Sequence, residues 1–279
     1  MLSLSSFSNE NFVIGAIVFL TGIQIILSCL ESIYDGYTYR PTQWLSWQHI
    51  RAAKKVFSGN TWVNRRLDYI FEYPTILLLF WLRLSASLYL IWLITHNSPY
   101  HQFTGLILVI TILGVLIVLR NTFSNNGADQ LANIILIAVS ISTLEGEGSV
   151  IKTLSLIFIA CQSQLSYLTS GFFKLLEKDW RNGTSLKGIF STEVFGHPLL
   201  KKVMDRWPSS YKVASAGVIY GELALGCSMF FPPKITLVLL ATGALFHFLT
   251  AIIMGLNAFF WVFVATYPAV YFLSLRIHA

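Results

Sequence analysis

Charged side chains are scarce in this sequence. They make up 11% of its 279 residues, against about 25% in a typical soluble domain, which excludes an ordinary water-soluble domain. The sequence also lacks the HExxH, CxxC, GxSxG and phosphate-binding glycine patterns that are the usual signatures of zinc proteases, serine hydrolases and nucleotide-dependent enzymes, and no metal site is predicted. Its three cysteines, Cys29, Cys161 and Cys227, all fall in apolar segments, where a disulfide framework is not expected.

Long apolar runs make up most of the chain. Apolar residues account for 55% of it, and they recur in runs near the ~20 residues that cross a bilayer as a helix. These runs do not alternate as the strands of a membrane barrel do. The sequence therefore predicts an all-α, polytopic membrane helical bundle with about eight transmembrane helices, forming a single domain over residues 1–279 whose motif-bearing half is residues 151–279. The predicted spans are residues 12–30, 75–95, 104–121, 130–145, 151–173, 212–231, 235–254 and 257–275.

The basic residues cluster in two segments. The chain has a formal net charge of +6, and segments 31–74 and 174–212 together hold 14 of its 19 lysines and arginines. The positive-inside rule predicts that both segments lie on the cytoplasmic side of a multi-pass membrane protein. The lipid bilayer is then a predicted partner. No nucleic-acid partner is predicted, because no basic stripe lies on a soluble module.

Segment 31–74 also has an apolar pattern. In the stretch WLSWQHIRAAKKVF, the apolar residues Trp44, Trp47 and Ile50 recur at helical spacing, with three cations among the residues that follow. This pattern is typical of an amphipathic basic helix that lies in the plane of the membrane interface. We therefore expect segment 31–74 to be an amphipathic basic loop at the bilayer surface.

Three ionisable residues stand out within the predicted spans, namely Arg83, Glu222 and His247. An ionisable side chain inside a membrane is costly unless it is paired or hydrated, so each is a candidate functional residue. Structural alternatives stay open for all three. Arg83 and Glu222 have opposite charges and could pair, and His247 could hydrogen-bond a neighbouring helix.

The fifth predicted span adds a pattern of small and polar residues. Ser163, Tyr167, Gly171, Lys174 and Lys178 follow one another at steps of four, four, three and four, which places them on one helix face. Such a face points toward the bundle interior or a cavity rather than lipid. Lys174 is then either a base in a dry pocket or an anchor that reaches lipid headgroups.

The stretch around Lys174 resembles a known family. YLTSGFFKLLEKDWRNG, which begins at Tyr167, is similar to the membrane-domain motif of vitamin K-dependent gamma-glutamyl carboxylase and of the bacterial horizontally transferred transmembrane domain proteins. Two later segments resemble the family in the same order: YGELALG, which contains Glu222, and FHFLTAIIMGLNAFFW, which contains His247. The NNGADQLANI stretch around Asp129 resembles a segment in the membrane component of sporulation-delaying peptide maturation.

The resemblance implies a chemistry and a set of roles. Lys174 matches the lysine that deprotonates reduced vitamin K in the carboxylase, and His247 matches a histidine near the same pocket. Tyr167, Gly171 and Glu222 are then the predicted cofactor-binding residues, and a reduced quinone such as vitamin K hydroquinone is the implied cofactor. A peptide substrate and a partner protein that helps to hold it are the implied partners.

Two alternatives stay open at this stage. The first function is modification or maturation of a peptide at the membrane with Lys174 as the base, by a carboxylase-like membrane enzyme. The second is a non-enzymatic membrane component for binding, export or immunity to a secreted peptide. Sidedness is also open, because the carboxylase resemblance places Lys174 on the lumenal side and the charge rule places it on the cytoplasmic side.

Overall fold

The chain folds into α-helices. A computed structural model describes residues 4–54, 62–96, 103–121, 127–144 and 149–279, and these residues form thirteen α-helices and no strand. The all-α prediction is therefore confirmed. The helices are α1 (Glu10–Tyr34), α2 (Trp47–Ala53), α3 (Trp62–Phe71), α4 (Thr75–Thr95), α5 (Thr104–Arg120), α6 (Gly127–Thr143), α7 (Val150–Leu176), α8 (Lys178–Arg181), α9 (Thr184–Phe190), α10 (Pro198–Arg206), α11 (Ser209–Gly226), α12 (Pro233–Met254) and α13 (Asn257–Ile277).

Four of the described helices are long and apolar enough to cross a membrane, namely α1, α4, α12 and α13. The apolar helices α5 and α6 are shorter. Each of the eight predicted spans coincides largely with one of α1, α4, α5, α6, α7, α11, α12 and α13. The helical membrane bundle is thus confirmed, while the number of helices that cross the bilayer stays a prediction.

Contacts along the chain define two compact units. The first comprises residues 1–17 and 148–279, and the second comprises residues 18–147. The first unit contains the motif-bearing half of the sequence. The prediction of a single domain over residues 1–279 stays a prediction.

In the second unit, α4 packs against α5, and α5 packs against α6. The helix predicted in the basic segment is present as α2, but its apolar face is not free for lipid. Trp47 and Ile50 are 4% and 1% exposed, the Trp47 ring lies 4.9 Å from the Phe71 ring, and Trp47 Nε1 donates to Asp68 at 2.7 Å. Trp47 therefore packs against α3 rather than lipid, and Ile50 is also buried, while the position of segment 31–74 at the bilayer surface stays a prediction. Residues 55–57 of the predicted helix lie outside the described residues.

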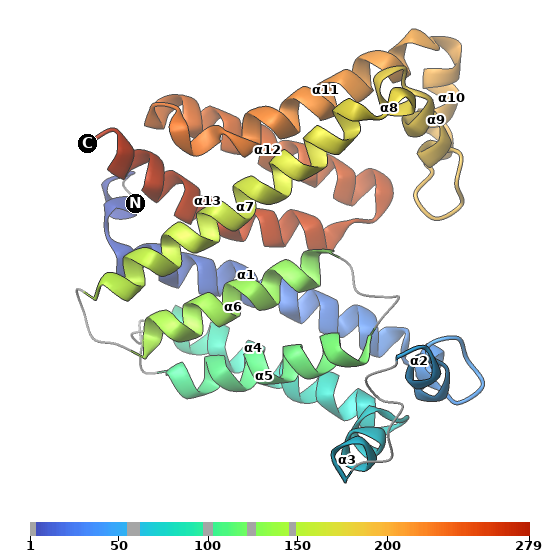
Figure 1. Cartoon of the computed structure of the whole chain (residues 1–279), viewed down its shortest axis with the longest axis vertical. Coiled ribbons are helices and arrows are strands. Elements are labelled where there is room, and N and C mark those ends of the chain that lie inside the picture. Colours follow the sequence, from blue (N-terminus) through green and yellow to red (C-terminus); the bar gives the residue numbers. More distant parts are fainter. Residues whose placement is uncertain (1–3, 55–61, 97–102, 122–126, 145–148) are drawn as a thin grey trace. The chain divides into compact units, whose positions relative to one another are not determined.

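In the first unit, the 27-residue helix α7 packs against both α11 and α13 (Figure 1). Ser149 caps its first turn, because the Ser149 side chain accepts a hydrogen bond from the backbone N–H of Ile151. Ser163, on the predicted polar face, hydrogen-bonds Thr266 of α13 at 2.8 Å. The polar face of α7 therefore points into the bundle, as its spacing predicts.

Short helices follow α7. Glu177 is in an extended conformation, so α7 ends at Leu176 and α8 begins at Lys178. This break corrects the predicted helix face: it runs from Ser163 to Lys174 and does not continue to Lys178, which is exposed. Helices α8, α9 and α10 then lead to α11 (Figure 1).

A carboxylate outside the predicted spans connects α10 to α11. Asp205 accepts hydrogen bonds from Lys201 Nζ at 2.7 Å and from the Tyr211 hydroxyl at 2.9 Å, and these bonds hold the pKa of the Asp205 carboxyl below its usual range. A lowered folded-state pKa contributes stability above the unfolded-state pKa, and this contribution is lost as pH falls through the folded-state pKa. Asp205→Asn is therefore expected to lower the melting temperature at neutral pH but not well below about pH 3.9.

Thermal melts of the two proteins at a series of pH values would measure this difference. Glu193→Gln, a change at another exposed carboxylate of the same unit, serves as the control for the loss of a negative surface charge. A difference between Asp205→Asn and the parent that is equally large at all pH values would contradict the assignment.

Candidate functional site

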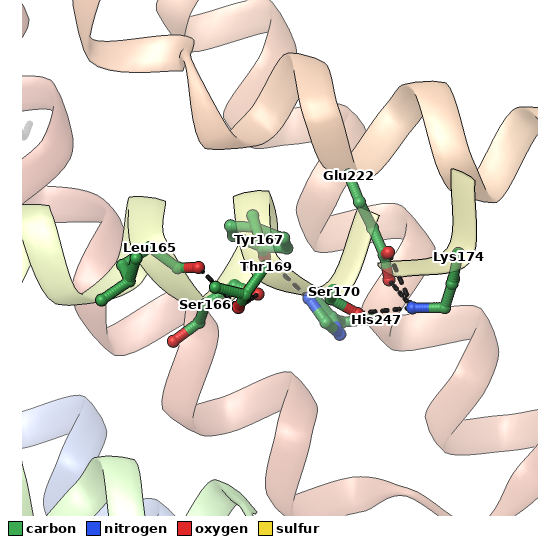
Figure 2. Close-up of polar contacts among 8 residues, drawn as sticks. All are labelled: Leu165, Ser166, Tyr167, Thr169, Ser170, Lys174, Glu222 and His247. Carbon is green, nitrogen blue, oxygen red and sulfur yellow. Dashed lines mark hydrogen bonds and ion pairs between the residues drawn. The ribbon is translucent and has the colours of Figure 1, made fainter. Parts of the chain in front are cut away.

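Lys174 and Glu222 form an ion pair between α7 and α11 (Figure 2). Lys174 Nζ donates to the two carboxylate oxygens of Glu222, Oε1 at 2.8 Å and Oε2 at 2.7 Å, and to Ser170 Oγ at 2.5 Å. The side chains of Lys174 and Glu222 are only 18% and 10% exposed. The pairing of Glu222 with Arg83 that opposite charges suggested is therefore wrong.

Helix geometry explains this arrangement. Ser170 and Lys174 are four residues apart on α7, so they lie one turn apart on the same face. Gly171 is on the side of α7 that meets α11, where an added Cβ would lie 3.0 Å from Leu223 Cγ and 3.2 Å from Glu222 Cβ. Gly171 thus allows the close approach of α11 that brings Glu222 to Lys174. Its predicted role in cofactor binding stays a prediction.

An aromatic ring also lies near the Lys174 ammonium. Lys174 Nζ is 5.2 Å from the centroid of the Trp180 ring, a distance at which a cation is attracted to an aromatic face. The Trp180 carbonyl accepts a hydrogen bond from the Ser215 hydroxyl of α11. Trp180 belongs to the family-like motif, but no pattern in the sequence indicated that its ring would contact the lysine.

His247 is held from α7 and α13. Its Nε2 hydrogen-bonds the Tyr167 hydroxyl at 2.7 Å (Figure 2), and the same hydroxyl lies 2.8 Å from the Tyr267 hydroxyl. The His247 ring also stacks on Phe263, with centroids 4.6 Å apart and planes 7° apart. The hydrogen bond to a neighbouring helix that was one expectation for His247 is therefore present. Tyr267 is a member of this cluster that sequence analysis missed, because no spacing rule links α13 to α7.

The network around Tyr167 gives a direct test of its structural importance. Tyr167→Phe removes the hydroxyl that the buried His247 and Tyr267 share, and unpaired buried polar groups cost about 1 to 3 kcal/mol. We expect the free energy of unfolding in detergent, followed by circular dichroism, to fall by about that amount. Tyr220→Phe, a change at an exposed tyrosine of α11, is the matched control and should cause almost no change. Equal losses of unfolding free energy in Tyr167→Phe and Tyr220→Phe would show that the Tyr167 hydroxyl does not stabilise the protein through this network.

A cavity of about 510 Å³ adjoins both clusters. Lys174, Glu222 and His247 all line it, together with Ser170 and Trp180. Most of the remaining lining consists of apolar side chains from α9 to α13, such as Ile189, Met204, Val218, Leu249 and Phe259. The structure therefore brings three of the five predicted site residues to one cavity. Tyr167 contacts this site through His247, and Gly171 contacts it through Glu222.

The arrangement limits what Lys174 can do as it stands. Its amino group donates to three acceptor oxygens, which uses all three N–H donors of an ammonium and leaves no free lone pair. Lys174 can act as a base only after its proton has moved, and Glu222 is the carboxylate that lies within hydrogen-bonding distance of it. The Lys174–Glu222 pair is thus a unit that can exchange a proton with a ligand in the cavity. The proposed general-base role stays a prediction.

Comparisons with known proteins agree with the resemblance in the sequence. Residues 138–274 match the family model of the HTTM domain, the horizontally transferred transmembrane domain. The match includes α7 to α12 and most of α13, and it contains every residue of the site described above. No curated protein and no solved structure matches the chain.

Proposed function

We propose that the C-terminal site of this helical membrane protein, whose residues 138–274 match the HTTM domain model, binds a hydrophobic molecule with a polar head group. The Lys174–Glu222 pair exchanges a proton with that head group during modification or maturation of a peptide at the cytoplasmic membrane. The observation that carries this proposal is the position of a buried ion pair in the wall of a large apolar cavity.

The cavity suits a quinol-like ligand. Small-molecule sites are mostly apolar clefts of about 300 to 1,000 Å³ with a few polar groups that fix orientation, and this cavity of about 510 Å³ has that composition. A reduced quinone of the vitamin K hydroquinone type has an apolar ring system and two hydroxyl groups. When bound, it would supply an acidic hydroxyl and reducing equivalents.

The residues around the cavity divide into two groups. Lys174 and Glu222 form the proton-exchanging pair, in which transfer of a proton from Lys174 to Glu222 would produce a neutral amine and a neutral acid. His247 has its Nε2 engaged by Tyr167, so Nδ1 is the ring nitrogen that remains for a ligand oxygen. Tyr167 and Tyr267 are positioning residues, because they contact His247 or each other rather than the cavity.

A comparison of reduced and oxidised ligands tests the proposal. The full chain in nanodiscs would be titrated with a short-chain naphthoquinone and with its hydroquinone, and tryptophan fluorescence quenching would report binding near Trp180. We expect the wild type to prefer the hydroquinone by about tenfold, because hydrogen bonds to a charged group are worth about 1.5 to 3 kcal/mol. Lys174→Met should lose this preference and keep the affinity for the oxidised ring.

Two controls make this test specific. Trp180→Phe should remove most of the saturable quenching while a competition assay still detects binding. Val213→Leu, a change at an exposed residue of α11, should behave as wild type. Absence of saturable binding of either ligand would refute the proposed function, and an unchanged preference in Lys174→Met would refute the role of the lysine.

A second candidate function is favoured by the surface of α10. Lys202 and Arg206 are exposed there beside the exposed apolar residues Leu199 and Val203, a combination that suits a non-enzymatic role in holding an anionic peptide. In that case, replacing Lys202 and Arg206 with glutamine would abolish capture of an acidic amphipathic peptide, and Lys174→Met would leave it unchanged. If Lys174→Met abolished peptide capture while the glutamine variant kept it, the result would support the enzyme instead.

A further inference from the structure

The second unit contains a polar cavity of about 230 Å³. Residues of α1, α4, α5 and α6 line it, along with the segment that follows α1. Unlike the cavity beside Lys174, it is lined by an arginine, three carboxylic acids and several hydroxyl groups. The function proposed above uses none of these residues.

Arg83 lies at the buried end of this cavity. It is 3% exposed and sits in the middle of α4, one of the helices long and apolar enough to cross a membrane. Its guanidinium donates one hydrogen bond among the described residues, from Nη2 to Asn133 Oδ1 at 2.9 Å, and its Nε has no partner there. A guanidinium has five N–H donors, so most donors of Arg83 have no partner in the part of the chain that the structure describes.

The surroundings of Arg83 are built to hold it. A Cβ added at Gly114 of α5 would collide with both Arg83 and Asn133, so glycine at this position provides the space for the guanidinium. Asn133 is fixed in turn, because its Nδ2 donates to the Asp129 carbonyl at 2.8 Å. Asp129 Oδ1 accepts from Gln24 at 2.9 Å and from a serine of α1 at the same distance.

The charges around the cavity restrict the class of ligand. Arg83 attracts an anionic group, but Glu31, Asp35 and Asp129 also line the cavity, and they disfavour a ligand with a net negative charge. A simple cation would leave the unused donors of Arg83 without an acceptor, at a cost for each buried group. A small molecule that carries both a carboxylate and an ammonium satisfies both sets of residues.

Aromatic side chains and cavity size agree with this class. Trp44 and Phe80 line the cavity, and aromatic faces attract ammonium groups. Asp35 and Trp44 are exposed, whereas Arg83 is buried, so the acidic and aromatic end is the one that opens to the outside. At about 30 Å³ for each water-sized group, the volume accommodates about seven or eight non-hydrogen atoms, the size of a small amino acid.

We propose that this cavity binds a small α-amino acid as its zwitterion. The carboxylate accepts hydrogen bonds from Arg83, and the ammonium lies toward Asp35 and Trp44. The site lies entirely within the second unit and does not depend on the function proposed for the C-terminal cavity.

Binding of three small molecules to the full chain in nanodiscs tests the proposal. L-alanine carries both charged groups, acetate carries the carboxylate alone, and ethylammonium carries the ammonium alone. Isothermal titration calorimetry should show that alanine binds at least about tenfold more tightly than either fragment. Failure to bind alanine up to about 10 mM would overturn the proposal. Acetate binding as tight as that of alanine would also overturn it, since the cavity would then be a simple anion site.

Two variants test the assigned orientation. Arg83→Lys keeps the positive charge but loses the planar fork of donors, and it should weaken alanine binding by about tenfold or more. Asp35→Asn changes an exposed residue, so it should fold normally, and it should weaken alanine binding by about threefold to tenfold while naphthoquinone binding at the C-terminal site is unchanged. Unchanged alanine affinity in Asp35→Asn would refute the position given to the ammonium.

Discussion

Lys174→Met is expected to lower the free energy of unfolding by about 3 kcal/mol, because it leaves a buried carboxylate without its partner. Glu222 is 8% exposed as a residue, and its carboxylate oxygens lie 2.7 and 2.8 Å from Lys174 Nζ. Breaking a fully buried pair typically costs about 3 to 5 kcal/mol. The side chains here keep 18% and 10% exposure, so we place the effect at the lower end. Unfolding in detergent, followed by circular dichroism, would measure it.

A double-mutant cycle separates the pair from the individual side chains. Glu222→Gln alone should also destabilise the protein, since it leaves the Lys174 ammonium partly buried. The double variant, with both changes, should regain more than half of the loss, because neither charge remains unpaired. Additive losses would mean that Lys174 and Glu222 do not stabilise each other, and Lys174 would then be better described as an interfacial anchor.

The chain also provides a matched control for burial. Lys201 and Asp205 form an ion pair at 2.7 Å, the same distance as the closest contact between Lys174 and Glu222, but their side chains are 36% and 37% exposed. Exposed pairs contribute little to stability. Lys201→Met should therefore cost much less stability than Lys174→Met at neutral pH and physiological salt. A loss as large as that of Lys174→Met would show that burial is not what makes the Lys174–Glu222 pair matter.

The sequence could predict the helices and the side of α7 that faces inward. Apolar runs of bilayer length are a strong signal, and all eight predicted spans coincide with helices. The regular spacing of Ser163, Tyr167, Gly171 and Lys174 correctly placed one face of α7 against the rest of its unit, because that periodicity is a local property of a helix. The cost of polar groups in a membrane likewise identified Glu222 and His247, and both line the cavity.

The partners of these residues could not be predicted, because they are set by contacts between distant segments. Charge complementarity suggested Arg83 for Glu222, but Arg83 bonds Asn133 and Glu222 bonds Lys174. Tyr267 joins the His247 network from a position 100 residues away from Tyr167. The face predicted to continue to Lys178 stops because the backbone becomes extended at Glu177, and no single residue there is a strong helix breaker. The catalytic and cofactor roles of the site residues stay predictions.

Gly183→Ala should be among the most destabilising single substitutions in the first unit. Gly183 has a φ of +84°, where a residue with a Cβ pays about 1 to 2 kcal/mol. The added Cβ would also lie 2.6 Å from the backbone nitrogen of Lys212 and 2.6 Å from the carbonyl carbon of Tyr211. These atoms belong to the first turn of α11 and cannot rotate away. The overlap adds to the conformational cost, for a total of about 3 to 5 kcal/mol.

Gly255 separates the two contributions. Its φ of +73° imposes a similar conformational cost, but an added Cβ there would meet nothing within 4 Å. Gly255→Ala should therefore lose only about 1 to 2 kcal/mol of stability, and the excess loss in Gly183→Ala measures the contact between the α8–α9 turn and α11.

That contact also affects the site, because Gly183 is three residues after Trp180, whose carbonyl accepts a hydrogen bond from Ser215 of α11. If the turn moves away from α11, Trp180 should move away from Lys174, and fluorescence quenching by the naphthoquinone should weaken in Gly183→Ala but not in Gly255→Ala. Equal losses of stability and quenching in the two variants would show that the turn is not held against α11 in this way.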